Sequence, residues 1–263
     1  MRTFINSSRY RQLPWIGVAT FILGCGSGVD DQTSSKTSQQ IQFGYVDDGH
    51  PAVGMLVDDG GSFCSGTLIA PDVVLTAAHC AQLSLTSFFV GNGSADTRPE
   101  DDVGMTRYAV ADQIAHASYN GGSVCPDPGF DLGLVFLVQP VVGVAPLPYA
   151  SDQPPALNAE CETVGFGVHQ ERRSRTAGVK RGAWETIAAV GASSIKVNLE
   201  TGIADHGDSG GPLLCDGVIA AATSCGNDSS PSHTTGYYAR VDTAALWISQ
   251  AIQTWHVSYG NQL

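Results

Sequence analysis

The chemically informative residues of this 263-residue sequence lie in two short segments. Residues 207–212 read Gly-Asp-Ser-Gly-Gly-Pro, which places Ser209 among glycines, and residues 76–80 read Thr-Ala-Ala-His-Cys, which supplies His79. A serine hydroxyl is a poor nucleophile at neutral pH unless a nearby base removes its proton. The glycines leave backbone N–H groups free to face a substrate. Together, the two segments predict nucleophilic catalysis by Ser209 with His79 as its base.

Short strands joined by tight turns must position these residues. The sequence is 43% hydrophobic and contains 31 glycines and 13 prolines, which is typical of many short strands joined by turns. Its length suffices for one large all-β domain or for two small barrels that share an interface. Helical periodicity appears only after Asp242, which we expect to be an N-cap. The apolar residues that recur there at spacings of three and four are Ala245, Ile248, Ile252 and Trp255.

Four further segments have counterparts, in the same order, in one known family. They read Phe-Cys-Ser-Gly-Thr-Leu-Ile at 63–69, Asp-Leu-Gly-Leu at 131–134, Cys-Glu-Thr-Val-Gly-Phe-Gly at 161–167 and Gly-Tyr-Tyr-Ala-Arg-Val at 236–241. With them, residues 41–255 resemble the chymotrypsin/trypsin-type serine proteases. The resemblance implies an all-β fold of two six-stranded antiparallel β-barrels, an active-site cleft between them and a C-terminal α-helix. It also implies a serine endopeptidase that hydrolyses peptide bonds through an acyl-enzyme on Ser209.

The resemblance assigns roles to the residues of the site. His79 takes the Ser209 proton and later delivers it to the leaving amine, while the N–H groups of Gly207 and Ser209 form the oxyanion hole. The third member is a carboxylate that fixes the imidazole tautomer. Asp131 is the best candidate, because it heads a strongly apolar run in which a charge needs a reason. The alternatives are Asp127 and Asp112.

The resemblance also implies activation by proteolysis. Asp208 would pair with the new α-ammonium group, and Ile41 is the candidate new terminus. Residue 40 is Gln rather than Lys or Arg, so we do not expect a trypsin-like activator. The family usually has two adjacent glycines here, and this sequence has only Gly44. A form that needs no cleavage therefore remains an alternative.

The primary specificity pocket is expected to begin at Ile203 and Ala204. Neither residue carries the carboxylate that selects Lys or Arg, so the pocket is predicted to be apolar and shallow, with a preference for small or medium apolar side chains. Asp205 could select a cation, but it stands where the family often has a cysteine. The other expected pocket or substrate-strand residues are His206, Ser224, Cys225, Gly226 and Gly236.

The first forty residues are interpreted as an export signal and a tether. A basic start precedes an apolar run at 13–23, which is well below the ~20 residues that span a bilayer. The run ends in Gly24-Cys25, which is similar to a bacterial lipoprotein signal with Cys25 as the lipidated residue. We therefore divide the chain into a signal peptide at 1–24, a flexible tether or propeptide at 25–40 and a protease domain at 41–263. The expected location is the cell envelope, with the outer membrane favoured; ordinary secretion is the alternative.

Seven cysteines are an odd number for an exported protein. Lipidation of Cys25 would leave six, whose pairing the spacing alone does not decide. The resemblance makes two bonds expected, Cys64–Cys80 and Cys161–Cys215. The remaining pair, Cys125–Cys225, falls on two loops that border the substrate cleft in this family, so a third bond there is a hypothesis.

The formal net charge of −12 argues against nucleic acid or an anionic membrane as a partner. We expect a polypeptide substrate, an activating protease, a membrane contact only through the lipid anchor and a monomeric protein. The sequence has neither zinc-ligand spacing nor a phosphate-binding loop, so no cofactor or metal is predicted. The acidic residues Asp96, Glu100, Asp101 and Asp102 are expected to form a solvated loop, with a calcium-binding loop as the alternative.

Two rival functions are compatible with parts of the sequence. A catalytically silent homologue would act as a binding module on the same fold, but it would usually lack a member of the triad. An α/β-hydrolase would place Ser209 in a Gly-x-Ser-x-Gly turn, which residues 207–211 do contain. The order His, Asp, Ser and the lack of alternating helices argue against that fold.

Overall fold

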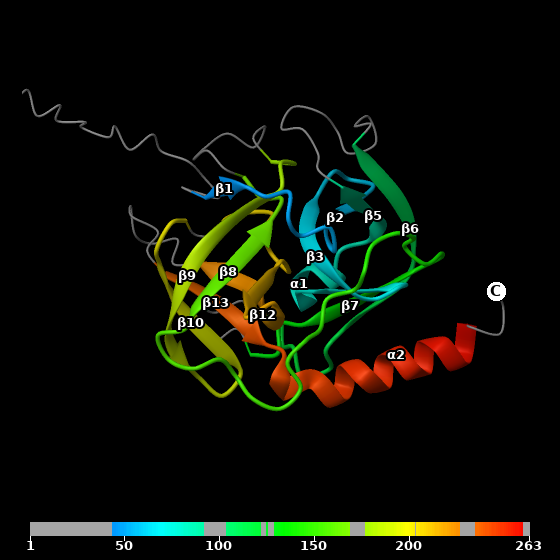
Figure 1. Ribbon diagram of the computed structural model, residues 1–263. Coiled ribbons are helices and arrows are strands. Elements are labelled where there is room, and N and C mark those ends of the chain that lie inside the picture. Colours follow the sequence, from blue (N-terminus) through cyan, green and yellow to red (C-terminus); the bar gives the residue numbers. More distant parts are fainter. Residues whose placement is uncertain are drawn as a thin grey trace, which may run out of the picture. The chain divides into compact units, whose positions relative to one another are not determined.

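The computed structural model describes residues 44–91, 104–121, 125, 129–168, 177–202, 204–226 and 235–259. These residues form two antiparallel β-barrels and one long C-terminal helix (Figure 1). The fold predicted from the resemblance is confirmed. Predictions for Cys25, Ile41, Asp127, Ile203 and the acidic stretch at 96–102 lie outside the described residues.

The first barrel closes through six strands in the order β2-β3-β4-β7-β6-β5. Most of their buried side chains are apolar, and β7 is buried along its whole length. The short helix α1 (Ala78–Ala81) directly follows β4. The strands are β2 (Val53–Asp58), β3 (Phe63–Ala70), β4 (Val73–Thr76), β5 (Leu85–Gly91), β6 (Met105–Ala115) and β7 (Gly133–Leu137).

The second barrel runs in the order β9-β10-β13-β12-β11-β8, and pairing of β8 with β9 closes it. A short strand, β1 (Tyr45–Val46), pairs antiparallel with the first two residues of β9. The strands are β8 (Glu160–Gly165), β9 (Arg181–Val190), β10 (Ser194–Leu199), β11 (Pro212–Cys215), β12 (Val218–Gly226) and β13 (Thr235–Arg240).

One hydrophobic cluster connects the two barrels. It includes Phe89 from the first barrel, Phe166 and Leu214 from the second, and Trp255 from the C-terminal helix. Because these side chains bury each other, the two barrels share an apolar core rather than a wet interface. This shared core holds the loops at the barrel junction in fixed relative positions.

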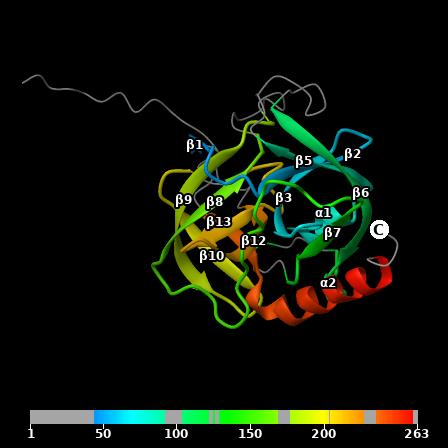
Figure 2. The same ribbon diagram turned by 45° about the vertical axis from the view of Figure 1, so that its right-hand side comes forward.

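The C-terminal helix begins close to where the periodicity predicts. A 3₁₀ turn at Asp242–Ala244 leads into α2 (Ala245–Tyr259), and Ile248 and Trp255 are buried. The N-cap prediction is wrong, because the Asp242 carboxylate binds Arg240 instead of a helix N–H. The helix follows the second barrel but lies along β7 of the first (Figures 1 and 2).

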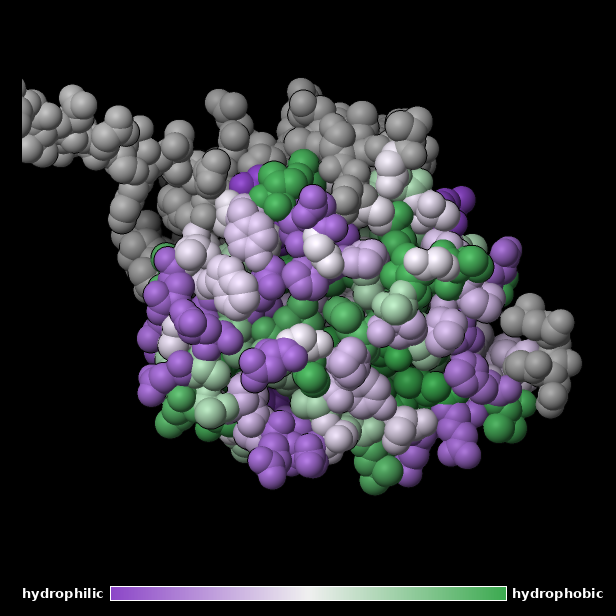
Figure 3. Space-filling model, in the orientation of Figure 1, coloured by the Kyte–Doolittle hydropathy of each residue, from purple (hydrophilic) through white to green (hydrophobic). Residues whose placement is uncertain are grey.

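The visible surface is mostly polar. Figure 3 shows hydrophilic residues over much of this face, with hydrophobic residues gathered near its middle. Among the described residues, no helix is both long and apolar enough to cross a membrane.

Candidate active site

A histidine and an aspartate form a hydrogen-bonded pair where the two barrels meet. α1 carries His79, and Asp131 is fully buried just before β7. The His79 Nδ1 atom lies 2.8 Å from Asp131 Oδ2, and the His79 backbone N–H donates to Oδ1 at 2.9 Å. Ser224 adds a hydroxyl that donates to Oδ2 at 2.5 Å. A carboxylate held this way keeps the proton on Nδ1 and leaves Nε2 free to accept one.

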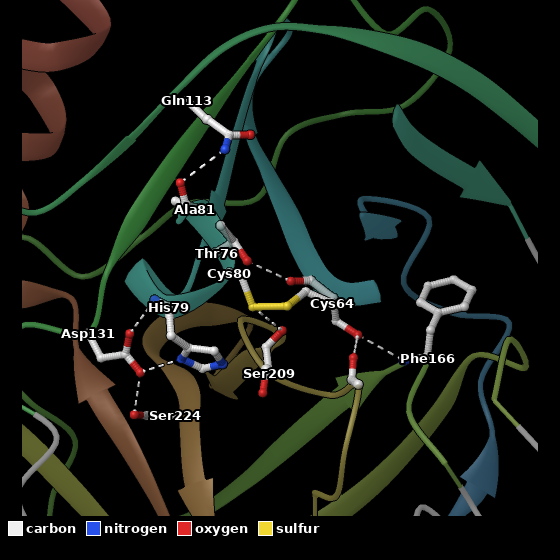
Figure 4. Close-up of a disulfide and its surroundings, with 12 residues drawn as sticks. Cys64, Thr76, His79, Cys80, Ala81, Gln113, Asp131, Phe166, Ser209 and Ser224 are labelled. Atoms are coloured by element: carbon white, nitrogen blue, oxygen red, sulfur yellow. Dashed lines mark hydrogen bonds and ion pairs between the residues drawn. A yellow bond between two sulfur atoms is a disulfide. The ribbon is translucent and has the colours of Figure 1, made fainter. Parts of the chain in front are cut away.

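Ser209 lies beside this pair. It lines the same cavity as His79, and the imidazole extends toward it in Figure 4. The segment that carries Ser209 precedes β11, so the second barrel supplies the hydroxyl and the first supplies the imidazole and carboxylate. The structure therefore brings together the three residues predicted to form the triad. Asp112 instead lies on β6, paired with Phe136.

The loop before Ser209 depends on glycine for two reasons. Gly207 has φ of +92°, a conformation that L-residues with side chains rarely adopt. A Cβ atom at Gly207 would also overlap the ring of Phe63. Among the described residues, no carbonyl accepts a hydrogen bond from the N–H of Gly207 or Ser209.

Asp208 is buried beneath this loop. Its Oδ1 accepts the Gly167 N–H at 2.7 Å, and its Oδ2 accepts the Asp205 N–H at 2.9 Å. Burial nevertheless raises its pKa to about 7, with the negative charge of Asp205 adding to the rise and the positive charge of Arg181 opposing it. A carboxylate in such a place is poorly compensated until a further cation approaches.

A cavity of about 210 Å³ lies next to Ser209. Six of the predicted pocket residues line it, namely Ala204, His206, Ser224, Cys225, Gly226 and Gly236. The sequence analysis did not single out Thr223, Thr235, Tyr237 and Tyr238, which also line it. They come from β12 and β13, whose pairing carries Thr223 opposite Tyr238. Only knowledge of this register could have added them.

A buried acid behind the pocket was also missed. Glu185 on β9 is fully buried, and the Tyr238 hydroxyl donates to its Oε2 at 2.6 Å. Burial raises the pKa of Glu185 to about 8, so this residue is mainly protonated at neutral pH. A glutamate in a strand is usually interpreted as solvent-facing, and nothing in the local sequence distinguishes this one.

Comparison with known proteins places the chain in a family. The family model described as Trypsin matches residues 41–248. The chain belongs to the trypsin family. Human kallikrein-2 is 31% identical over 73% of this chain and 81% of its own length. Snake venom serine protease serpentokallikrein-1 of Protobothrops mucrosquamatus is 29% identical over 73% of this chain and 78% of its own.

A solved structure shows the same fold. Mouse neuropsin, described as a serine protease of the limbic system, superimposes with a TM-score of 0.64 at 26% identity. The match covers 78% of this chain and 95% of that structure. This trypsin-family chain therefore shares its architecture with serine proteases whose sequences are only distantly similar.

Three disulfides of this trypsin-family chain join the cysteines in the predicted pairs. Cys64–Cys80 links β3 to α1, Cys161–Cys215 links β8 to β11, and Cys125–Cys225 links a loop to the pocket strand β12. Stable disulfides are typical of proteins exported to oxidising compartments. The bonds are thus consistent with export.

Within the described part of this trypsin-family chain, two clusters have the residue types of a metal site. Cys64, His79 and Cys80 form one, but both cysteines are in a disulfide and are not thiolate ligands. In the other, His50 lies between Asp47, with Nδ1 3.0 Å from Oδ1, and Glu162, with Nε2 3.6 Å from Oε2. The Lys180 ammonium donates to the His50 carbonyl at 2.8 Å. We interpret this second cluster as an ion-pair network that holds residues 47–50 against β8.

Proposed function

We propose that the protein is a serine endopeptidase that forms an acyl-enzyme on Ser209. The observation that carries this proposal is the Asp131–His79 pair in the cavity that Ser209 also lines. His79 removes the Ser209 proton as the hydroxyl attacks the substrate carbonyl, and then protonates the leaving amine. Asp131 stabilises the imidazolium. The N–H groups of Gly207 and Ser209 stabilise the oxyanion, and water releases the acyl group.

The proposed substrate is a polypeptide with a small or medium apolar side chain at the primary pocket. The small cavity volume and the presence of Ala204, Gly226 and Gly236 in its lining support this preference. Asp205, whose carboxylate accepts the His206 N–H, lines the cavity, whereas the buried Glu185 lies behind Tyr238 and is mainly neutral at pH 7. Glu185 therefore gives a substrate cation little attraction.

Activation is proposed to follow cleavage between Gln40 and Ile41 by another protease. The new α-ammonium group would compensate the buried Asp208 carboxylate, whose raised pKa reflects poor compensation. The mature domain would then be 41–263. The proposal retains export with lipidation at Cys25, attachment to the outer membrane and a monomeric state.

The experiment is covalent labelling of Ser209 by a fluorophosphonate probe, followed by peptide mass spectrometry. The form that starts at Ile41 is compared with the form that starts at Cys25, with Ser209→Ala as the blank. We expect labelling of the Ile41 form only, and a His79→Ala variant should lose about 10⁴–10⁶-fold in kcat. Equal labelling of both forms would contradict the activation step alone. Absence of labelling in folded protein would replace the enzyme with a silent binding module.

A further inference from the structure

Ser65, in the middle of β3, uses all of its polar groups on the segments that build the site. It is fully buried. Its backbone N–H donates to the Ser209 carbonyl at 2.8 Å, and its hydroxyl donates to the Gly207 carbonyl at 2.9 Å. One residue of the first barrel therefore holds both ends of the loop that supplies the nucleophile and the oxyanion-hole donors.

The remaining bonds of Ser65 reach two further segments. Its hydroxyl oxygen accepts the Phe166 N–H at 2.9 Å, and its carbonyl accepts the Thr76 hydroxyl at 2.8 Å. Phe166 directly precedes Gly167, whose N–H binds Asp208. Thr76 ends β4, three residues before His79. Ser65 thus contacts the segment that leads to His79, the segment that binds Asp208 and the loop that carries Ser209.

The surroundings of Ser65 are rigid. β3 pairs with both β2 and β4 in the closed barrel, and the preceding residue, Cys64, is joined to Cys80. The loop also packs tightly against this strand, because a Cβ atom at Gly210 would lie 2.6 Å from the Ser65 carbonyl oxygen. An anchor of this kind fixes a loop at the sub-ångström level that catalysis requires.

The hydroxyl contributes something that the backbone does not. A residue without it would keep the N–H and the carbonyl of position 65, but it would leave the Gly207 carbonyl and the Phe166 N–H without their present partner. A buried group that loses its hydrogen bond tends to rotate toward another partner or water, since the unpaired state is costly. Rotation of the peptide after Gly207 would turn the neighbouring N–H groups away from the oxyanion position.

We propose that Ser65 is a positioning residue for the oxyanion hole, and that its hydroxyl fixes the Gly207–Ser209 loop against the barrel that carries His79. The inference rests on the proposed function. It adds a residue that touches neither substrate nor reacting atoms but sets the geometry of those that do.

The test compares Ser65→Ala with Thr67→Val in the Ile41 form. Thr67 is the matched control, because it lies two residues away on the same strand, is equally buried, and has a hydroxyl with no partner among the described residues. With a peptide amide substrate, we expect Ser65→Ala to lower kcat by about 10–100-fold while KM changes by less than about threefold. Affinity for a peptide aldehyde, which mimics the tetrahedral state, should fall in parallel. Thr67→Val should change kcat by less than about twofold.

Further readouts separate this role from a general loss of structure. The pH profile of kcat/KM should keep its shape in Ser65→Ala, because the Asp131–His79 pair is untouched. Ser65→Thr and Ser65→Val have the same shape and differ only in the hydroxyl, so they decide the matter where Ser65→Ala does not fold. We expect the Thr variant to exceed the Val variant in kcat by about tenfold or more.

Three results would overturn the inference: an unchanged kcat in Ser65→Ala, equal losses in Ser65→Ala and Thr67→Val, or equal activity of the Thr and Val variants. A wild-type Ile41 form that reacts with neither probe nor substrate would overturn the proposed function and this inference with it. A reactive wild type with an unaffected Ser65→Ala would overturn the inference alone.

Discussion

Two buried carboxylates lie close to the substrate cavity inside the second barrel. Glu185 is held by Tyr238, and Asp208 by two backbone N–H groups. Burial raises both pKa values, that of Glu185 to about 8 and that of Asp208 to about 7. An acid that keeps its proton in the folded state but loses it in the unfolded state makes stability fall as pH rises.

The first prediction concerns Glu185. Between about pH 5 and pH 8 the unfolded chain binds fewer protons at this residue than the folded chain, so the wild type should lose stability across this window. Glu185→Gln should reduce that loss by about 1–3 kcal/mol, as measured by urea unfolding at pH 5 and pH 8. The exposed Glu160→Gln is the control and should behave as the wild type. The remaining slope belongs partly to Asp208. Equal slopes in wild type and Glu185→Gln would refute the assignment.

At the residue scale, what could be predicted depended on sequence context. His79, Asp131 and Ser209 stand in distinctive local frames, and the structure brings them together. Ser65 and Glu185 form hydrogen bonds with residues that are distant in sequence, at positions 207 and 238 respectively. Their polar side chains could be interpreted equally well as solvent-facing until the strand pairing was known.

At the element scale, a disulfide bond connects β12, which lines the cavity, to the loop that contains Cys125. Cys225 lines the cavity beside Ser209, so the bond restrains one wall of that cavity directly. Cys161–Cys215 instead joins β8 to β11, and neither cysteine lines the cavity. The two bonds should therefore differ in what their removal changes.

The second prediction compares these two bonds. Removing Cys125–Cys225 by a double alanine substitution should lower kcat/KM by about fivefold or more, mainly through KM, because the pocket wall becomes mobile. Removing Cys161–Cys215 should cost about 2–5 kcal/mol of unfolding free energy, with kcat/KM of the folded fraction unchanged. Steady-state kinetics and urea unfolding on both variants provide the measurement. The reverse pattern, or equal effects on KM, would contradict this division.

The pairing of β12 with β13 could not be predicted from the sequence. Runs such as 218–225 indicate a buried strand, but they do not say which strand lies beside it. The register shifts between Thr223 and Cys225, and such an irregularity decides which side chains face the cavity. The additional pocket residues were missed for this reason.

At the scale of the whole molecule, α2 ties the end of the chain to the first barrel. Trp255 stacks on Phe136 with ring centroids 4.7 Å apart, and its Nε1–H donates to Asp72 Oδ2 at 3.0 Å. His256 Nε2 lies 2.9 Å from the other oxygen of Asp72. The helix follows the second barrel in sequence and packs against the first, so it connects the two barrels.

The third prediction tests the contact of α2 with the first barrel. Trp255→Ala should lower the free energy of unfolding by about 3–5 kcal/mol, because it removes a buried aromatic side chain from the core shared by both barrels. Trp255→Phe, which loses chiefly the bond to Asp72, should cost about 1 kcal/mol. Leu246→Ala, on the exposed face of the same helix, is the control and should change stability by less than about 0.5 kcal/mol. A Trp255→Ala variant as stable as the control would show that α2 merely decorates the surface.

The architecture itself could be predicted, because several sequence segments occur in the same order as in a known family. The spacing of apolar residues after Asp242 also indicates a helix. The contact of that helix with the first barrel could not be predicted. Trp255 reads as a core-facing residue, but the surface it covers is set by Asp72 and Phe136, which are far away in the sequence. Periodicity shows which face of a helix is buried and leaves its partner open.

The disulfide between Cys64 and Cys80 has a consequence for when the site can exist. It joins the strand of Ser65 to the helix of His79, and Cys125–Cys225 joins the pocket wall to a neighbouring loop. A reducing cytoplasm keeps cysteine thiols reduced, so a newly synthesised chain in that compartment lacks both disulfide bonds. In the proposed exported enzyme, the active site would therefore be completed only by oxidation after export, once the polypeptide has left the compartment that holds the cell's own proteins.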